Sequence, residues 1–409
     1  MYKKILAITF AVMFLSSIMS VTSGGIMTPA FAVKQNHHKT HLPKLIANVT
    51  GISAYQQSVH VSEKFNKIYT ISPLSGNVTI IDGKTNQPVD SVFIGNDVNH
   101  AVVDDEANKL YVLSSGKSQI ITMNTKTNQV IGSPIQIGNP HLPPGCNNFD
   151  IPCTDPGSDS YGISMNHKTG TLYVTNIADE TVSVVDTKTR AVVDTIPVGV
   201  PAYLSSVNEK TNKIYVSVSY DATVVVIDGK TNKVIKSIPT GTPATPDDCY
   251  ETFTCTDYGS DTYYVVVNEK TNKIYAGNLF DGTLLVIDGK TDKVIGSPIS
   301  TGDSLSGLAV NHEINTVYAG DYTTDNLYVI DGKSDKIIGS PILIGTPATP
   351  LGCKLSLFNC VDYGSGPESI DVNEKTNRIY VSEDVGAVAV LDAKTHHKIS
   401  EIHLGHGGK

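Results

Sequence analysis

The stretch Val207-Asn-Glu-Lys-Thr-Asn-Lys-Ile-Tyr-Val216, continued by Thr223-Val-Val-Val-Ile-Asp-Gly-Lys-Thr-Asn-Lys-Val-Ile235, decides the fold of this chain. Each apolar run has the length of a β-strand and is bounded by a cluster of Asn, Asp, Gly, Lys and Thr that favours a turn. A further run ends at Pro239-Thr-Gly241, and the short run 203–207 precedes the unit. One unit therefore predicts four strands.

An Asp or Asn marks the turn after the third strand in every copy of this unit. The copies lie about 42 residues apart, and about 20 additional residues stand at every second junction. Repeats of this length with four strands each are typical of a β-propeller, in which each repeat forms one blade. We therefore predict an all-β fold, a seven-bladed β-propeller of four-stranded antiparallel blades that forms a single domain over residues 44–405. The marking residues are Asp82, Asn124, Asp186, Asp228, Asp288, Asp331 and Asp392.

The turn before the second strand has its own regularity, because Asn or Gly stands at its last position in every copy. These residues accept a positive φ at low cost, so the pattern predicts a left-handed turn residue without any functional requirement. The seven positions are Asn66, Asn108, Gly170, Asn212, Asn272, Asn315 and Asn377.

The motifs Leu172-Tyr-Val-Thr-Asn176, Asp228-Gly-Lys-Thr-Asn232 and Val207-Asn208 carry a family resemblance. In these motifs the sequence resembles the YVTN family of β-propeller repeat proteins, and the resemblance covers residues from about 52 to 405. Members of that family are found on archaeal and bacterial surfaces and in periplasms, so the resemblance implies an exported propeller. It implies little about chemistry, since the matching residues are strand and turn residues. Three insertions that contain cysteines depart from the plain repeat array of the family.

The composition, with 40% hydrophobic and 17% charged residues, is that of a soluble globular protein. A formal net charge of −9 argues against a nucleic-acid partner. The chain has no Trp, which removes the repeat signature of WD-type propellers and most aromatic platforms for sugars.

Residues 1–32 have the pattern of a secretory signal peptide. Two lysines precede the apolar run Ile5–Met19, and a cleavage site is predicted after Ala32. An uncleaved membrane anchor is the alternative, although the run is short for a span of roughly 20 residues. We expect a secreted, extracellular or cell-surface location, with no membrane span after removal of the signal.

Residues 33–43 are predicted to form a flexible leader. Its His37, His38 and His41 are candidate ligands for a divalent transition metal, because neutral imidazole binds such ions well. The alternative is a disordered polar segment without a metal.

Proline recurs in the fourth strand of the repeats. Because proline cannot donate to a ladder on both sides, these strands are predicted to be the outer edges of the blades. The loops between strands one and two and between strands three and four then lie on one face of the disc. That face carries uniform turns, which we interpret as solvated hairpin chemistry. The other face carries the variable loops and the crossovers, where binding usually lies. The prolines are Pro88, Pro134, Pro197, Pro239, Pro298 and Pro341.

Three insertions interrupt alternate crossovers, near residues 139–160, 242–262 and 346–369, and each contains two cysteines. Pairing within each insertion is the simplest of the 15 arrangements that six cysteines allow, and export favours oxidation. We predict three local disulfides that brace the loops, and a zinc site is the weaker alternative. The pairs are Cys146 with Cys153, Cys249 with Cys255, and Cys353 with Cys360.

Each insertion ends in an acidic tail that leads into an innermost strand. These carboxylates are candidate oxygen ligands for Ca²⁺ around the mouth of the central channel. Turns in which Asp bonds its own backbone are the alternative. No other cofactor is predicted. The candidate rim residues are Asp155, Asp159, Asp257, Asp261, Asp362, Tyr258 and Tyr363.

No catalytic residue is predicted, because only His100 and His141 are candidate bases on the variable face and no Gly-x-Ser-x-Gly elbow is present. The favoured function is binding of a protein or surface-polymer partner through the face with the insertions. The alternatives are a propeller enzyme of the lactonase, lyase or redox-subunit type that acts at the channel mouth, and a self-associating surface-layer component.

Closure of the ring has two candidate strands. Residues 44–51 resemble the outer strand at 233–241, so we predict that the N-terminal segment takes the outer place in the last blade. Residues 397–404 are the alternative.

Overall fold

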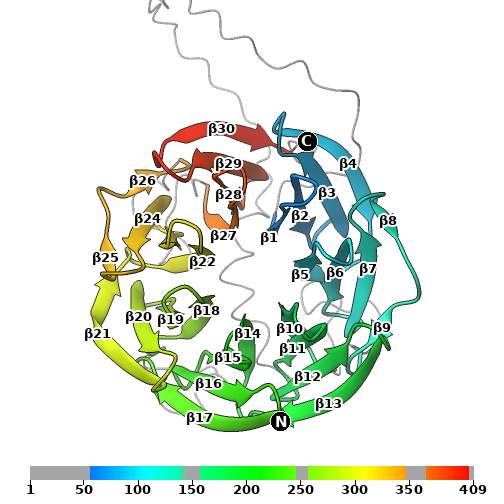
Figure 1. The fold of residues 1–409 in the computed structure, drawn as a ribbon, viewed down its shortest axis with the longest axis horizontal. Helices are drawn as coiled ribbons and strands as arrows, with labels where there is room; N and C mark the ends of the chain where they lie inside the picture. The colour runs from blue at the N-terminus through cyan, green and yellow to red at the C-terminus, as the bar shows by residue number, and fades with distance from the viewer. Residues whose placement is uncertain (1–55, 141, 143–156, 246–256, 347–364, 405–409) are drawn as a thin grey trace, which may run out of the picture.

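The computed structural model describes residues 56–140, 142, 157–245, 257–346 and 365–404. Their strands form seven antiparallel sheets arranged as blades around a central axis, which confirms the predicted seven-bladed propeller (Figure 1). Within these residues, no helix is long and apolar enough to cross a membrane.

The first four blades occupy the chain up to Pro239. Blade 1 is β1 (Ser58–Ser62), β2 (Lys67–Ser72), β3 (Asn77–Asp82) and β4 (Gln87–Phe93). Blade 2 is β5 (Val98–Asp104), β6 (Lys109–Ser114), β7 (Gln119–Asn124), β8 (Gln129–Val130) and β9 (Ile135–Gln136). Blade 3 is β10 (Ser160–Asn166), β11 (Thr171–Asn176), β12 (Thr181–Asp186) and β13 (Ala191–Pro197). Blade 4 is β14 (Ala202–Asn208), β15 (Lys213–Val218), β16 (Thr223–Asp228) and β17 (Lys233–Pro239).

Three further blades complete the ring. Blade 5 is β18 (Thr262–Asn268), β19 (Lys273–Asn278), β20 (Thr283–Asp288) and β21 (Lys293–Ser300). Blade 6 is β22 (Leu305–Asn311), β23 (Thr316–Asp321), β24 (Asn326–Asp331), β25 (Lys336–Ile337) and β26 (Ile342–Leu343). Blade 7 is β27 (Pro367–Asn373), β28 (Arg378–Glu383), β29 (Ala387–Asp392) and β30 (Lys398–His403).

Each blade is a meander whose first strand lies nearest the axis and whose fourth lies at the circumference (Figure 1). The outer strands are edge strands, which confirms the prediction made from their prolines. In blades 2 and 6 the outer strand is split, and Pro134 and Pro341 each stand between its two halves.

The turn before the second strand of each blade has the predicted left-handed residue. The φ values are 50° at Asn66, 55° at Asn108, 66° at Gly170, 52° at Asn212, 54° at Asn272, 58° at Asn315 and 53° at Asn377. The left-handed residue predicted from the turn sequence is thus present in all seven blades.

The hydrophobic core lies between the blades and not in one central mass. One cluster joins Val226 and Ile238 of blade 4 to Val265 and Ile287 of blade 5. Because both sheet faces are covered in this way, the middle strands read as continuous apolar runs without strict alternation.

A tyrosine of the second strand anchors several blades to the next one. In blade 4, Tyr215 donates a hydrogen bond of 3.1 Å to Asp292 Oδ1, in the last turn of blade 5, and Lys213 Nζ lies 2.7 Å from Asp292 Oδ2. Tyr275 and Asp335 repeat the contact between blades 5 and 6 at 2.8 Å. The tyrosines at this position are fully buried in all seven blades: Tyr69, Tyr111, Tyr173, Tyr215, Tyr275, Tyr318 and Tyr380.

The predicted closure by the N-terminal segment is wrong. The outer place of blade 7 is filled by β30, which pairs with β29 from Ala387–His403 to Leu391–Lys398. Blade 7 is therefore built from consecutive strands, like the other six, and residues 44–51 lie outside the described residues. The seam to blade 1 is closed by side-chain packing, with Val59 and Ile81 against Val388 and Ile402.

Candidate binding face

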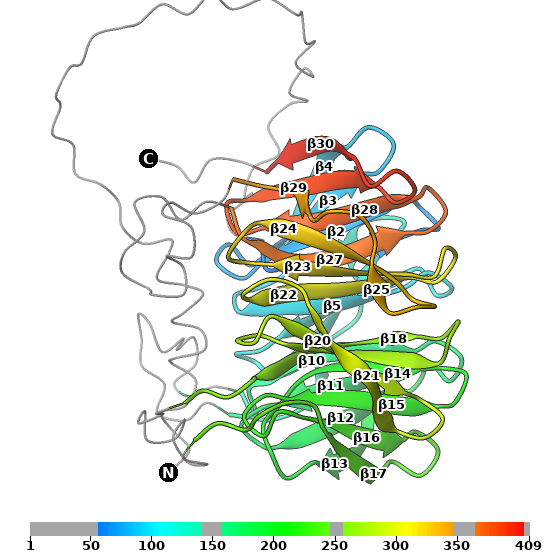
Figure 2. The same cartoon turned by 90° about the vertical axis from the view of Figure 1, so that its left-hand side faces the viewer.

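The two faces of the disc are defined by its loops. We call the face formed by the second-to-third-strand loops and the crossovers the insertion face, and the face formed by the remaining hairpin turns the hairpin face. Figure 2 shows the disc from its edge, with the strand ends of the blades gathered on two opposite faces. All three insertions start and end at crossovers, so all three leave the disc on the insertion face.

The three insertions are closed at their base by the same reciprocal pair of hydrogen bonds, which we call the stem. At the second stem, Thr242 N donates to Ser260 Oγ at 2.8 Å, and Ser260 N donates to Thr242 O at 2.7 Å. Asn139 with Ser158 and Thr346 with Ser365 form the other two stems at distances between 2.7 and 2.9 Å.

The tails of the insertions form these stems, with the sequence Gly-Ser-Asp in the first two and Gly-Ser-Gly in the third. Gly157 and Gly259 have φ values of 57° and 67°, and a Cβ at either position would collide with a backbone carbonyl, that of Asn139 or that of Thr242. The glycine is thus required by a left-handed backbone and by a close approach at the same time. The repeated tail is in this respect a structural signature.

Two of the predicted rim carboxylates point into the protein. Asp159 and Asp261 are each 1% exposed, and each accepts a hydrogen bond from a serine of the preceding blade. Ser115 Oγ donates to Asp159 at 3.0 Å, and Ser219 Oγ donates to Asp261. Burial raises the pKa of Asp261 to about 6, although the Ser219 hydrogen bond works in the opposite direction.

Two other predicted rim residues are exposed. Asp257 accepts a hydrogen bond of 2.9 Å from Gly259 N, as expected for an Asp that bonds its own turn. Tyr258 is 45% exposed, and its ring lies 5.7 Å from that of Phe280.

The remaining predicted site residues lie outside the described part of the chain: Asp155, Asp362, Tyr363, His37, His38, His41, His141 and the six cysteines. Among the residues that the structure does describe, no group of three or more His, Cys, Asp or Glu side chains could hold a metal ion. The calcium rim and the disulfides stay predictions.

A cluster of buried tyrosines on the inner strands was not anticipated from the sequence. Tyr161, Tyr203 and Tyr263 come from the inner strands of blades 3, 4 and 5, with ring centroids 4.9 to 5.9 Å apart. Tyr263 donates its hydroxyl to that of Tyr161, which also lies 3.5 Å from Gln57 Nε2 of blade 1. The signal was present, because a tyrosine stands at the second position of three successive inner strands.

The inner strands have bulges at these tyrosines. The pairing of β10 with β11 shifts register between Ser160 and Ile163, and that of β14 with β15 shifts between Ala202 and Ser205. Bulges commonly re-aim a side chain. Burial holds the pKa of Tyr161 above its ordinary value, so its hydroxyl is protonated at physiological pH.

His100, the candidate base, lies beside this cluster. Its ring is 4.9 Å from that of Tyr161, and burial lowers the pKa of His100 to about 4. The imidazole is therefore neutral at physiological pH.

Charge on the described part of the insertion face is almost entirely negative. Lys117 is the one basic residue among the described residues of its loops and crossovers. The acidic residues of that face and of the strand ends beneath it are Asp97, Asp159, Asp179, Glu180, Asp221, Asp257, Asp261, Asp281, Asp303, Asp321, Asp325, Glu368, Glu383 and Asp384. The face also exposes large apolar side chains, with Leu74 at 54%, Phe280 at 37% and Val385 at 48%.

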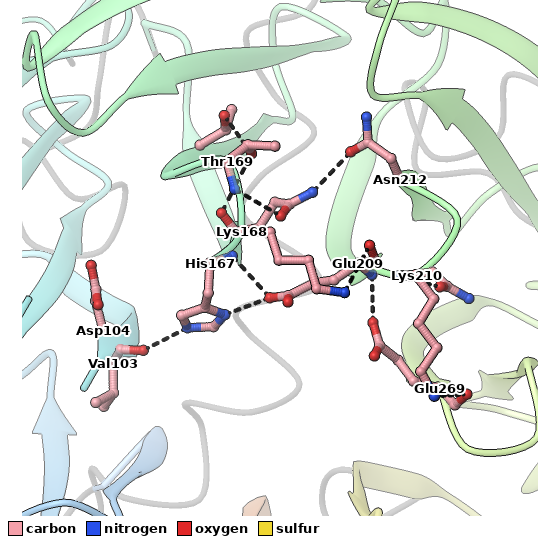
Figure 3. Close-up of polar contacts among 12 residues, drawn as sticks. Val103, Asp104, His167, Lys168, Thr169, Glu209, Lys210, Asn212 and Glu269 are labelled. Atoms are coloured by element: carbon pink, nitrogen blue, oxygen red, sulfur yellow. Dashed lines mark hydrogen bonds and ion pairs between the residues drawn. The ribbon is translucent and has the colours of Figure 1, made fainter. Parts of the chain in front are cut away.

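The hairpin face does more than present solvated turns. Its first turns bond one blade to the next: Glu209 N donates to Glu269 Oε1 at 2.5 Å, and Lys210 Nζ donates to Glu269 O at 2.8 Å (Figure 3). Glu374 N donates to Glu63 in the same manner across the closing seam, at 2.6 Å. The interpretation of this face as purely solvated was therefore incomplete, because the repeated Glu and Lys link neighbouring blades.

Histidine replaces the glutamate of this network in two blades. His167 Nδ1 lies 2.7 Å from Glu209 Oε1, and its Nε2 lies 3.0 Å from the carbonyl oxygen of Val103 (Figure 3). His312 lies in the same way between Glu374 and the Val267 carbonyl, at 3.0 and 3.3 Å. Both partners of each ring are acceptors, so the ring satisfies both contacts only as an imidazolium.

Burial opposes that charge at both histidines. Burial by itself would lower both pKa values, but the hydrogen bonds have the larger combined effect. Those to Val103 and Glu209 raise the pKa of His167 above its ordinary value, and that to Glu374 raises the pKa of His312. We call these two histidines the clamps, because each contacts residues of both neighbouring blades.

Neither a protein-family model nor a curated protein sequence matches the chain. The conclusions about function therefore rest on the fold and on the geometry of the two faces.

Proposed function

We propose that this protein is an exported or cell-surface binding scaffold of the YVTN type, and that it binds a protein or surface polymer through its insertion face. The observation that carries the proposal is the common stem. Three insertions start and end at matched stems on one face of the disc, at alternate junctions. Variable loops on a rigid scaffold are where binding functions concentrate.

The contrast between the two faces supports the choice of the insertion face. On the hairpin face, Glu and Lys side chains of the first turns contact the neighbouring blade, and turn carboxylates such as Asp228 accept hydrogen bonds from their own turn. On the insertion face, apolar side chains such as Leu74, Phe280 and Val385 are exposed beside acidic ones. Single exposed apolar side chains are ordinary on any protein surface, whereas neighbouring ones, such as the rings of Phe280 and Tyr258 at 5.7 Å, are the kind that mark interaction sites.

Calcium binding at the acidic tails belongs to the same proposal as an auxiliary element. Asp257 is exposed at the second tail and is available for it, whereas Asp261 is buried. The propeller enzyme and the surface-layer component are rival functions, and the experiment below separates them from the proposal.

The stems make a direct test feasible. Because the two ends of each insertion are already hydrogen-bonded, residues between Asn139 and Ser158, Thr242 and Ser260, and Thr346 and Ser365 can be replaced by short Gly-Ser linkers. Wild-type protein and this loop-less variant would be compared for binding to an array of cell-surface polymers and envelope proteins. We expect loss of binding with an unchanged circular dichroism spectrum.

The matched control changes the other face. A variant with Lys210→Ser, Lys270→Ser and Lys375→Ser should bind as the wild type does. Retained binding by the loop-less variant, together with loss in the lysine variant, would place the function on the hairpin face. Turnover of a lactone or polysaccharide by the wild type would favour the enzyme, and concentration-dependent self-association without any array ligand would favour the surface-layer component.

A further inference from the structure

Three successive blades present an aspartate at the same exposed place. Asp179, Asp221 and Asp281 occupy equivalent positions in the second-to-third-strand loops of blades 3, 4 and 5, and all three are exposed. In the neighbouring blade 2 the equivalent position is held by Lys117. The acidic row is therefore an arc over three blades and not a ring around the whole disc.

Two exposed aromatic rings lie close together within this arc. Phe280 precedes Asp281 in the loop of blade 5, and its ring lies 5.7 Å from Tyr258 on the stem of the second insertion. Both rings remain exposed, at 37% and 45%. The arc thus combines three carboxylates with an exposed apolar surface.

A buried carboxylate beneath the arc gives an independent indication of a cationic ligand. Asp261 directly precedes the inner strand of blade 5 and is 1% exposed, and its Oδ1 accepts a hydrogen bond from Ser219 of the blade 4 loop. Its Oδ2 has no hydrogen-bond partner among the described residues. A buried carboxylate with an unbonded oxygen is costly, and its negative potential adds to that of the carboxylates above it, so a positive charge docked on the arc would lower that cost without touching Asp261.

We propose that this acidic arc docks a basic polypeptide segment, one rich in lysine or arginine. The inference rests on the proposed function and names its partner class. Carboxylates at Asp179, Asp221 and Asp281 attract the cationic heads, while the aliphatic stems of lysine or arginine pack on Phe280 and Tyr258. Charge complementarity favours such a segment, because no described lysine or arginine of blades 3 to 5 lies on this face.

The test uses a synthetic lysine-rich peptide and its fully acetylated form, which has the same length without the charge. Binding of the fluorescent peptides to the full-length protein is measured by anisotropy at several NaCl concentrations. We expect binding of the charged peptide, weakening with salt because exposed charges are screened. The acetylated peptide should bind at least about tenfold more weakly.

Matched variants locate the contact. The triple substitution Asp179→Asn, Asp221→Asn and Asp281→Asn should weaken binding about tenfold, given the modest free energy of each exposed ion pair. Phe280→Ser should weaken it as well, without changing its salt dependence. The control removes three exposed acidic groups elsewhere, with Glu106→Gln, Glu313→Gln and Asp194→Asn, and should bind as the wild type does.

Several results would overturn the inference. If the two triple variants, in the arc and elsewhere, weakened peptide binding equally, the peptide would be attracted by the net charge of the protein and not by the arc. Equal binding of both peptides, or no binding of the charged peptide, would exclude a basic segment. The loop-less variant could lose its array ligand while the Asp179→Asn, Asp221→Asn, Asp281→Asn variant keeps it. That result would support the proposed function and exclude a basic segment as the partner. An array hit that is a neutral glycan, or a second copy of this chain, would have the same consequence.

Discussion

The hydroxyl of Tyr215 offers the sharpest test of how the blades are held together. Tyr215 is fully buried, and its hydroxyl donates at 3.1 Å to Asp292, a carboxylate of the next blade that is 12% exposed. A hydrogen bond to a charged group contributes roughly 1.5–3 kcal/mol. Tyr215→Phe keeps the ring and removes only this bond, so we expect the free energy of unfolding to fall by about 1.5–3 kcal/mol.

Two equivalent tyrosines provide an internal scale. Tyr69 donates to a backbone carbonyl, that of Thr125, at 3.1 Å, so Tyr69→Phe should cost about 0.5–1.5 kcal/mol. The hydroxyl of Tyr380 is buried without a partner in the described part of the chain. Tyr380→Phe should therefore be neutral or stabilising, because it removes a buried polar group that has no hydrogen bond.

The assay is urea denaturation followed by circular dichroism, with the midpoints compared at constant m. The order of stability loss should be Tyr215→Phe, then Tyr69→Phe, then Tyr380→Phe. A double-mutant cycle of Tyr215→Phe with Asp292→Asn should show a coupling free energy of about 1 kcal/mol or more. Equal losses at all three tyrosines, or a coupling near zero, would refute the view that this hydroxyl links the blades.

Three other predictions concern the clamps, the stems and the cysteines. The raised folded pKa of His167 and His312 means that their stabilisation is fully present below the unfolded pKa of about 6.5 and is lost as pH rises through the folded value. The stability difference between wild type and the His167→Gln, His312→Gln variant should therefore shrink from about pH 5.5 to about pH 8.5, and a pH-independent difference would contradict the clamps. Gly259→Ala places a Cβ in a left-handed backbone against the Thr242 carbonyl. We expect the free energy of unfolding to fall by at least about 1–2 kcal/mol and the second insertion to be cleaved faster by proteases. A fall within about 0.5 kcal/mol would show that the stem can relax. Non-reducing peptide mapping should find Cys146–Cys153, Cys249–Cys255 and Cys353–Cys360, and any bridge between two insertions would rule out the local pairing.

The sequence by itself determined the blades. Turn residues such as Asn66 and Asn212 act within one hairpin, and a strand-length apolar run needs only its neighbouring strand to be recognised. These signals are local and repeat seven times, so the number of blades, the strand order and the two faces of the disc could all be predicted. The outer position of the proline-containing strands followed from the same kind of reasoning, because a missing N–H is a property of one residue.

Only the tertiary structure decided what each blade does to the next. The inward orientation of Asp159 and Asp261 depends on serines 44 and 42 residues away in the preceding blade, and that of His167 on a glutamate 42 residues away. The sequence did not decide which strand closes the ring, because residues 44–51 and β30 have similar patterns. In the structure β30 takes the outer place, since it pairs with β29. Side-chain contacts between repeats are set by how closely two twisted sheets approach, and this distance is not encoded in the pattern of either repeat alone.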